Sequence, residues 1–138
     1  MRFLVLFILA LTFTACRDSV KEEDLKHLNG YWEIEKVVFQ DGNQKEYNIN
    51  LSIDYFEYNN FKGFRKKVQP TLDGSYITSD DAEFFEISTE NNTFNIEYRN
   101  DLSSWVEEIR LLSNDKMILV NSEGLNYHYR RFEPVMAK

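Results

Sequence analysis

Residues 93–99 read Thr-Phe-Asn-Ile-Glu-Tyr-Arg, and this stretch decides the fold class. Phe94, Ile96 and Tyr98 alternate with polar residues, and successive side chains of a β-strand point to opposite faces of the sheet. One face of this strand is therefore predicted to be buried and the other to contact water, as in an antiparallel sheet that covers a core on one side.

The same period of two, with more interruptions, recurs on both sides of this stretch. Turn residues such as Asp73-Gly74 and Asn91-Asn92 separate the segments, so most connections are predicted to be tight hairpins. We expect eight strands and a weaker ninth, at residues 31–39, 51–58, 61–68, 83–89, 93–99, 105–112, 117–121 and 126–132, with the weaker one at 75–78.

No segment between these strands has the length and period of a helix that could cover a sheet. The strands must then bury their apolar faces against one another, and closure into a barrel does this while it removes exposed sheet edges. We therefore predict an all-β fold, an antiparallel up-and-down β-barrel of about eight strands, with residues 29–138 as its domain. A sandwich of two sheets is the alternative, because a period of two does not show whether a sheet closes.

The two ends of the predicted barrel carry residues that suit one another. The first strand begins with Gly30-Tyr31-Trp32, and the last strand contains Arg130 and Arg131. An indole at the floor of a barrel offers a flat face to a guanidinium, whose N–H groups can also bond to free carbonyls. The alternation alone does not decide which of the two arginines lies over Trp32.

This pattern resembles that of the lipocalins, which have Gly-x-Trp at the start of the first strand and an arginine in the last. Gly30 and Trp32 match this motif, whereas the family's Thr-Asp-Tyr turn late in the barrel has no counterpart. The resemblance is nearest to the small lipocalin-like lipoproteins of Bacteroidetes. It implies a lipocalin/calycin-like barrel whose floor is closed by Trp32 together with Arg130 or Arg131.

The N-terminal residues form a short apolar segment that is typical of a cleaved signal peptide. The apolar run at residues 3–13 follows a single basic residue, Arg2. As a helix it would span only about half of the roughly 30 Å hydrocarbon layer of a membrane. Residues 1–15 are therefore predicted to be a leader rather than a membrane span.

The chain has one cysteine, Cys16, which excludes a disulfide within one molecule. Phe13-Thr14-Ala15-Cys16 resembles the lipobox of bacterial lipoproteins, although Phe13 stands where leucine is usual. The resemblance implies that the leader is removed, that Cys16 is acylated with fatty acids such as palmitate, and that the anchored protein lies in the bacterial cell envelope, at the outer membrane. An ordinary secretory leader with an incidental cysteine is the alternative.

Residues 16–28 are then expected to comprise the acylated cysteine, a tether and a short helix. Ser19 and Glu22 have the spacing of a capping box, and the acidic side chains of Glu22, Glu23 and Asp24 would favour the first turn of a helix. The same acidic stretch resembles the tether and export signal of some Bacteroidetes lipoproteins, and both interpretations can hold together.

Charge restricts the partners. The formal net charge is -7, and an acidic surface repels phosphate backbones, so we expect no nucleic-acid partner. Lysine and arginine cluster at one place in this acidic chain, at Lys62, Arg65, Lys66 and Lys67. This basic cluster could attract anionic headgroups or an acidic partner. Alternatively, its only role could be to deter the pairing of other strands at a sheet edge. The partners that we expect are a membrane, through the lipid anchor, and a small hydrophobic ligand; no protein partner can be named.

No pattern in the sequence predicts an enzyme, a metal site or a cofactor. His27 and His128 lie far apart and have no cysteine partners at zinc-ligand spacing. Glu107 and Glu108 are adjacent in a predicted strand, so they face opposite sides and cannot act together as an acid/base pair.

Aromatic residues are the remaining functional signal, at 15% of the chain. At inward positions they would either line an apolar pocket, in which tyrosine hydroxyls orient a ligand, or fill the lumen completely. If the lumen is open, we expect its lining to be Phe94, Ile96, Tyr98, Trp105, Tyr127 and Tyr129. The two functional hypotheses are thus a carrier of a small hydrophobic molecule and a filled barrel that serves as a protein-interaction or inhibitor module.

Overall fold

The computed structural model describes residues 18–79 and 81–134. Within these ranges one short 3₁₀-helix, η1 (Glu22–Leu28), precedes ten strands. The strands are β1 (Gly30–Val38), β2 (Gln44–Glu46), β3 (Ile53–Asn59), β4 (Lys62–Pro70), β5 (Tyr76–Thr78), β6 (Glu83–Glu90), β7 (Thr93–Arg99), β8 (Ser104–Leu112), β9 (Lys116–Asn121) and β10 (Asn126–Arg131). The predicted leader and Cys16 lie outside the described residues. In the part of the chain that is described, no helix is long and apolar enough to cross a bilayer.

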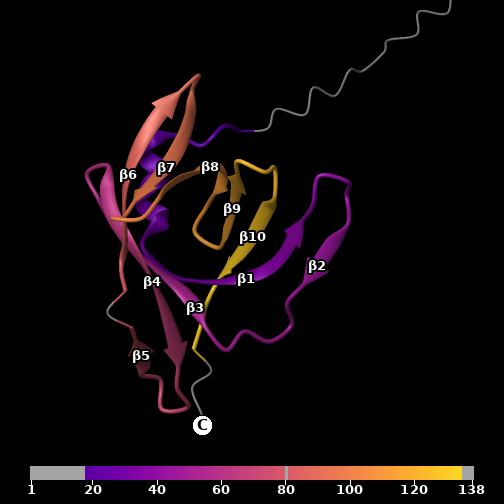
Figure 1. Cartoon of the computed structure of the whole chain (residues 1–138). Helices are drawn as coiled ribbons and strands as arrows, with labels where there is room; N and C mark the ends of the chain where they lie inside the picture. The colour runs from indigo at the N-terminus through magenta and orange to yellow at the C-terminus, as the bar shows by residue number, and fades with distance from the viewer. Residues whose placement is uncertain (1–17, 80, 135–138) are drawn as a thin grey trace, which may run out of the picture.

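Eight of the described strands close into a barrel. Neighbouring strands pair in the order β1, β3, β4, β6, β7, β8, β9, β10, and β10 pairs antiparallel with β1 from Trp32 to Val38. β2 extends the sheet beside β1 and β5 extends it beside β4, and both lie at the periphery of the molecule (Figure 1). The predicted up-and-down barrel is confirmed, and the sandwich alternative is wrong.

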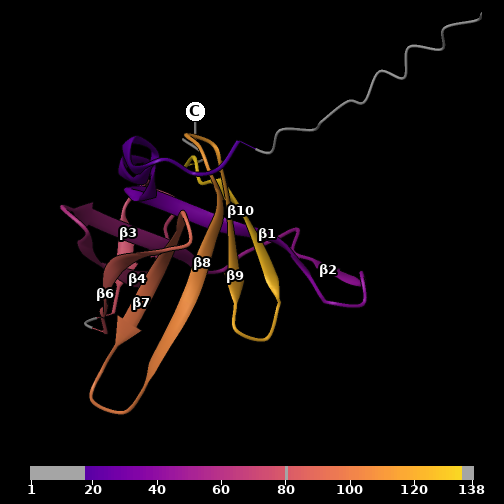
Figure 2. The same cartoon turned by 90° about the horizontal axis from the view of Figure 1, so that it is seen from above.

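Helix η1 covers one end of the barrel, where it packs against β3 and β8 (Figure 2). Its side chains Leu25 and Leu28 enter the core and are 0% exposed. The expected capping box at Ser19 is wrong, because the helix begins at Glu22 and a different residue satisfies its first turn. The carboxylate of Asp24 accepts a hydrogen bond of 2.9 Å from the backbone N–H of Lys21.

Apolar side chains fill the part of the lumen next to η1. They form one continuous core with the two leucines of the helix, and its members from the barrel are Trp32, Phe56, Phe85, Ile87, Ile96, Tyr98, Ile109, Leu112, Met117, Leu119 and Tyr129. Each buried aromatic residue removes about 150–250 Å² from water, so a few rings fill a narrow barrel. A ligand site inside the lumen is therefore expected at the opposite end.

Candidate ligand-binding site

Trp32 and Arg131 seal the end of the barrel that η1 covers. Arg131 Cζ lies 3.8 Å from the centroid of the Trp32 ring. The Arg131 guanidinium donates hydrogen bonds to three backbone carbonyls at this end, those of His27, Asn29 and Asn114. One side chain near the C-terminus thereby joins the helix, the first strand and the turn between β8 and β9.

Of the two arginines that the sequence left open, Arg131 is the one that lies over Trp32. Arg130 points outward and pairs with Glu33, with its Nε 2.6 Å from Oε1. Gly30 has a φ of +115°, and a Cβ at this position would lie 2.8 Å from Arg131 Nη1. Glycine is therefore suited to this position, because it adopts a positive φ without strain and has no Cβ that would clash with Arg131. These motif residues stabilise the floor and lie away from the open end.

A cavity of about 300 Å³ occupies the other end of the lumen. Side chains from six strands line it: Ile34 on β1, Asp54 on β3, Arg65 and Lys67 on β4, Trp105 and Glu107 on β8, Asn121 on β9, and Tyr127 and Tyr129 on β10. This volume is at the lower end of the roughly 300–1,000 Å³ that is usual for ligand pockets. The cavity therefore suits a small molecule.

The structure brings three of the six predicted lining residues together at this cavity: Trp105, Tyr127 and Tyr129. Ile96 and Tyr98 face inward but lie in the core, where they are 0% and 1% exposed. Phe94 is partly buried and packs against the same core. The alternation along a strand indicates which side chains face inward, but it does not indicate how deep in the barrel each one lies.

Sequence reasoning missed four charged side chains in the cavity: Asp54, Arg65, Lys67 and Glu107. Arg65 is held between two carboxylates, with Nη2 2.6 Å from Glu83 Oε2 and Nη1 3.2 Å from Glu107 Oε1. Its guanidinium also lies over the ring of Tyr98, 4.7 Å from the centroid. Charge-assisted hydrogen bonds and a cation–π contact therefore fix its position.

Burial changes the protonation of the groups around Arg65. Burial raises the pKa of the Glu107 carboxyl, and the positive charge of Arg65 opposes this rise. Burial alone would lower the pKa of Arg65, but the surrounding acidic groups raise it by more, so the guanidinium stays charged. Burial also raises the pKa of the Tyr98 and Tyr129 hydroxyls well above the usual value, which keeps both neutral.

Asp54 has fewer stabilising contacts than Glu107. It is 2% exposed, and Lys67 Nζ lies 2.7 Å from its Oδ1, although the Lys67 side chain is 63% exposed. Asp54 Oδ1 therefore has an ion-pair partner but accepts no hydrogen bond from the described residues. A buried carboxylate is fully stabilised only when it is both paired and hydrogen-bonded, which favours a ligand or water that supplies the hydrogen bond.

The basic cluster of the sequence is divided between the two faces of β4. Arg65 and Lys67 point into the lumen, whereas Lys62 points outward and pairs with Glu86, with 3.5 Å between Nζ and Oε1. Lys66 also points outward, over the ring of Phe64. Lys62 and Arg65 do not protect a sheet edge, because β4 pairs at these residues with β3 on one side and with β6 on the other.

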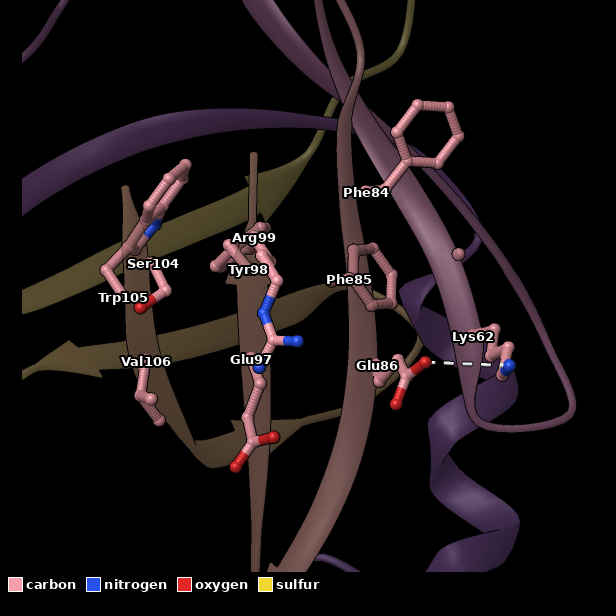
Figure 3. A pocket seen from close by; sticks show the side chains of 11 residues that line it. Lys62, Phe84, Phe85, Glu86, Glu97, Tyr98, Arg99, Ser104, Trp105 and Val106 are labelled. Carbon is pink, nitrogen blue, oxygen red and sulfur yellow. Dashed lines mark ion pairs between the residues drawn. The ribbon is translucent and has the colours of Figure 1, made fainter. Parts of the chain in front are cut away.

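A second hollow, the outer hollow, has a volume of about 470 Å³ and lies over β6, β7 and β8 (Figure 3). Its lining combines outward side chains with the inward side chains of Phe85, Tyr98 and Trp105. Its outward side chains are largely solvated: Phe84 is 62% exposed and Val106 43%. The exposed ion pair of Lys62 with Glu86 lies at its margin (Figure 3). The lumen cavity is the better candidate site, because its charged groups other than Lys67 are largely buried and therefore interact strongly with a ligand.

The two histidines do not approach this cavity. His27 takes part in the floor through its backbone carbonyl, and His128 lies on β10 between the two inward tyrosines, with its pKa lowered by burial. Within residues 18–79 and 81–134, no group of three or more His, Cys, Asp or Glu side chains is arranged to hold a metal ion.

The model of the lipocalin-like domain family matches residues 28–119, in agreement with the barrel architecture. A lipocalin-like protein from Bacteroides uniformis ATCC 8492 is 16% identical, with a TM-score of 0.47 over 77% of this chain and 99% of that one. An uncharacterized protein from Bacteroides eggerthii DSM 20697 is 14% identical, with a TM-score of 0.48 over 76% of this chain and 99% of that one. No curated protein matches the chain.

Proposed function

The chain belongs to the lipocalin-like family, and on this premise we propose that it binds a small molecule in the lumen cavity while a lipid anchor holds it in the bacterial cell envelope, at the outer membrane. The observation that carries the proposal is a barrel filled at one end and hollow at the other. Apolar walls and buried charges meet in this hollow, so the ligand combines a hydrophobic body with a polar group. No catalytic role is part of the proposal.

Binding in the lumen is expected to change the fluorescence of Trp105. The two tryptophans of the chain report on different parts of the barrel, because Trp32 is 0% exposed at the floor, whereas Trp105 lines the lumen cavity and also borders the outer hollow. We expect octanol, octanoate or octylamine to shift or quench the emission in a saturable way. The change should disappear in Trp105→Phe and persist in Val106→Thr, a substitution at the neighbouring outward position. Failure of all three probes to give a saturable change would exclude ligand binding in the lumen.

The anchor is supported by the leader and by the position of Cys16 directly behind it. Each methylene of an acyl chain that enters a membrane contributes about 0.8 kcal/mol, so two or three chains hold a protein stably. Cys16→Ser is therefore expected to move the protein from the membrane fraction to the soluble fraction and to abolish incorporation of labelled palmitate. Ser19→Ala, three residues away, should leave both unchanged. A Cys16→Ser protein that stays in the membrane fraction would refute lipid anchoring.

A second candidate function, an interaction module, is favoured by a row of aromatic rings on the outer wall. Neighbouring ring centroids in this row are 4.2 to 6.4 Å apart, in the order Phe132, Tyr76, Tyr31, Tyr55, Phe64, Phe84. The last ring borders the outer hollow of Figure 3. The lumen remains the first choice, because the rings of the row pack against one another, whereas the lumen contains a buried oxygen of Asp54 that accepts no hydrogen bond from the described residues.

A further inference from the structure

We propose that the lumen cavity recognises its ligand through a primary ammonium group, which displaces Lys67 and takes its place beside Asp54. The inference rests on the proposed function, because it concerns the chemistry of the ligand in the same cavity. Three features of the cavity carry it: an incompletely satisfied buried carboxylate, a resident ammonium that can leave, and walls that favour a cation.

Asp54 is the acceptor. It faces the lumen from β3 and is 2% exposed, and its Oδ1 accepts no hydrogen bond from the described residues. A buried carboxylate is costly unless it is both paired and hydrogen-bonded. The pair with Lys67 supplies the charge at 2.7 Å but not the hydrogen bond. A free ammonium inside the cavity can orient one of its three N–H groups along the lone pair of this oxygen.

Lys67 is a cation that can withdraw. It lies directly opposite Asp54 in the pairing of β3 with β4, and its side chain is 63% exposed. A lysine ammonium on a flexible stem is well solvated at the rim, so it can turn into water at small cost. Arg65, the other cation of the cavity, is 15% exposed and bound to two carboxylates. Of these two side chains, only Lys67 can make room for a ligand.

The charge balance and the walls favour a cation at the vacated place. Without Lys67, the lining retains the negative charges of Asp54 and Glu107 and the positive charge of Arg65. Glu83, which also pairs with Arg65, adds to this excess of negative charge. An ammonium ligand reduces the excess, whereas a carboxylate ligand increases it. The rings of Trp105, Tyr127 and Tyr129 line the same cavity, and aromatic faces attract cations. The ligand class is therefore a small amine with an apolar or aromatic body.

Three probes of nearly the same shape test this inference: phenethylamine, 2-phenylethanol and phenylacetate, which end in a cation, a neutral group and an anion. By calorimetry on the purified chain, we expect phenethylamine to bind at least about tenfold more tightly than the other two, which corresponds to about 1.4 kcal/mol. In Asp54→Asn this preference should vanish while the alcohol still binds. Glu57→Gln, which changes an outward carboxylate on the same strand, should keep the preference.

A second variant tests the displacement and does not require any change at Asp54. Lys67→Ala removes the internal competitor, so phenethylamine should bind it about tenfold more tightly than it binds the unchanged chain. Added n-butylammonium, which resembles the deleted side chain, should raise the melting temperature of Lys67→Ala. It should raise that of Lys66→Ala by less, because Lys66 points outward and Lys67 still competes for Asp54 in this variant.

The outcomes separate the inference from the proposed function. If the alcohol or phenylacetate binds best, or if Lys67→Ala gains no affinity for phenethylamine, the amine inference is overturned and lumen binding stands. If none of the three phenyl probes binds, the amine inference is also overturned. The fluorescence titration with the octyl probes then decides independently whether the lumen binds any ligand.

Discussion

Replacement of Arg65 by methionine is expected to lower the free energy of unfolding by about 3–5 kcal/mol, the usual cost of removing one partner from a buried ion pair. The Arg65 side chain is 15% exposed and that of its partner Glu107 is 7% exposed. Loss of the guanidinium leaves the Glu107 carboxylate without its counter-ion and removes the cation from the face of Tyr98. Urea denaturation monitored by circular dichroism measures the change.

Two further variants show whether the buried charge is the cause. Arg65→Met combined with Glu107→Gln should recover at least half of the lost stability, because the more deeply buried of the two partners of Arg65 is then neutral, while Glu83 is 41% exposed and solvated. Lys66→Met, at the adjacent outward position, should cost less than about 1 kcal/mol. A cost below about 1 kcal/mol for Arg65→Met, or a double variant no more stable than the single one, would contradict the ion-pair cluster.

Arg131→Met is expected to lower the free energy of unfolding by about 2–4 kcal/mol, since it removes a cation–π contact and leaves carbonyls at the floor without donors. Arg131 donates to the carbonyls of His27, Asn29 and Asn114 and lies 3.8 Å from the Trp32 ring centroid. The same urea experiment measures the change. Solvent access to Trp32, followed by acrylamide quenching, should rise because the floor loosens.

The neighbouring arginine provides the matched control for the floor. Arg130 carries the same charge but pairs on the outside with Glu33, and its side chain is 46% exposed. Arg130→Met should therefore cost less than about 1 kcal/mol and leave acrylamide quenching unchanged. Equal losses in the two variants would show that Arg131 has no special place at the floor.

Most of the barrel could be predicted from the sequence because its strands alternate and its turns carry Gly, Asp or Asn. Residues 93–99 form β7 with the predicted bounds, and Ile96 and Tyr98 face the core. β2 was missed because all three of its residues are exposed, so no alternation marks it. The start of η1 was misplaced because acidic residues at several neighbouring positions can satisfy the first turn of a helix.

The charged cavity could not be predicted because its members are spread over the chain and become neighbours only when the barrel closes. Arg65 and Lys67 stand in a basic run whose other members face water, and Asp54 and Glu107 belong to different hairpins. The sequence does contain one indication of the cavity: Arg65 and Lys67 are two residues apart in a strand, so their side chains must lie on the same face of the sheet. The sequence does not show that this face is the lumen.

A crystal structure of the chain saturated with the tightest-binding probe tests the lumen site most directly. The account predicts the probe in the lumen cavity, with its apolar body against Trp105, its polar group beside Asp54, and the Lys67 side chain turned toward solvent. A probe seated in the outer hollow over Phe84 and Val106, with the lumen unchanged, would contradict the account.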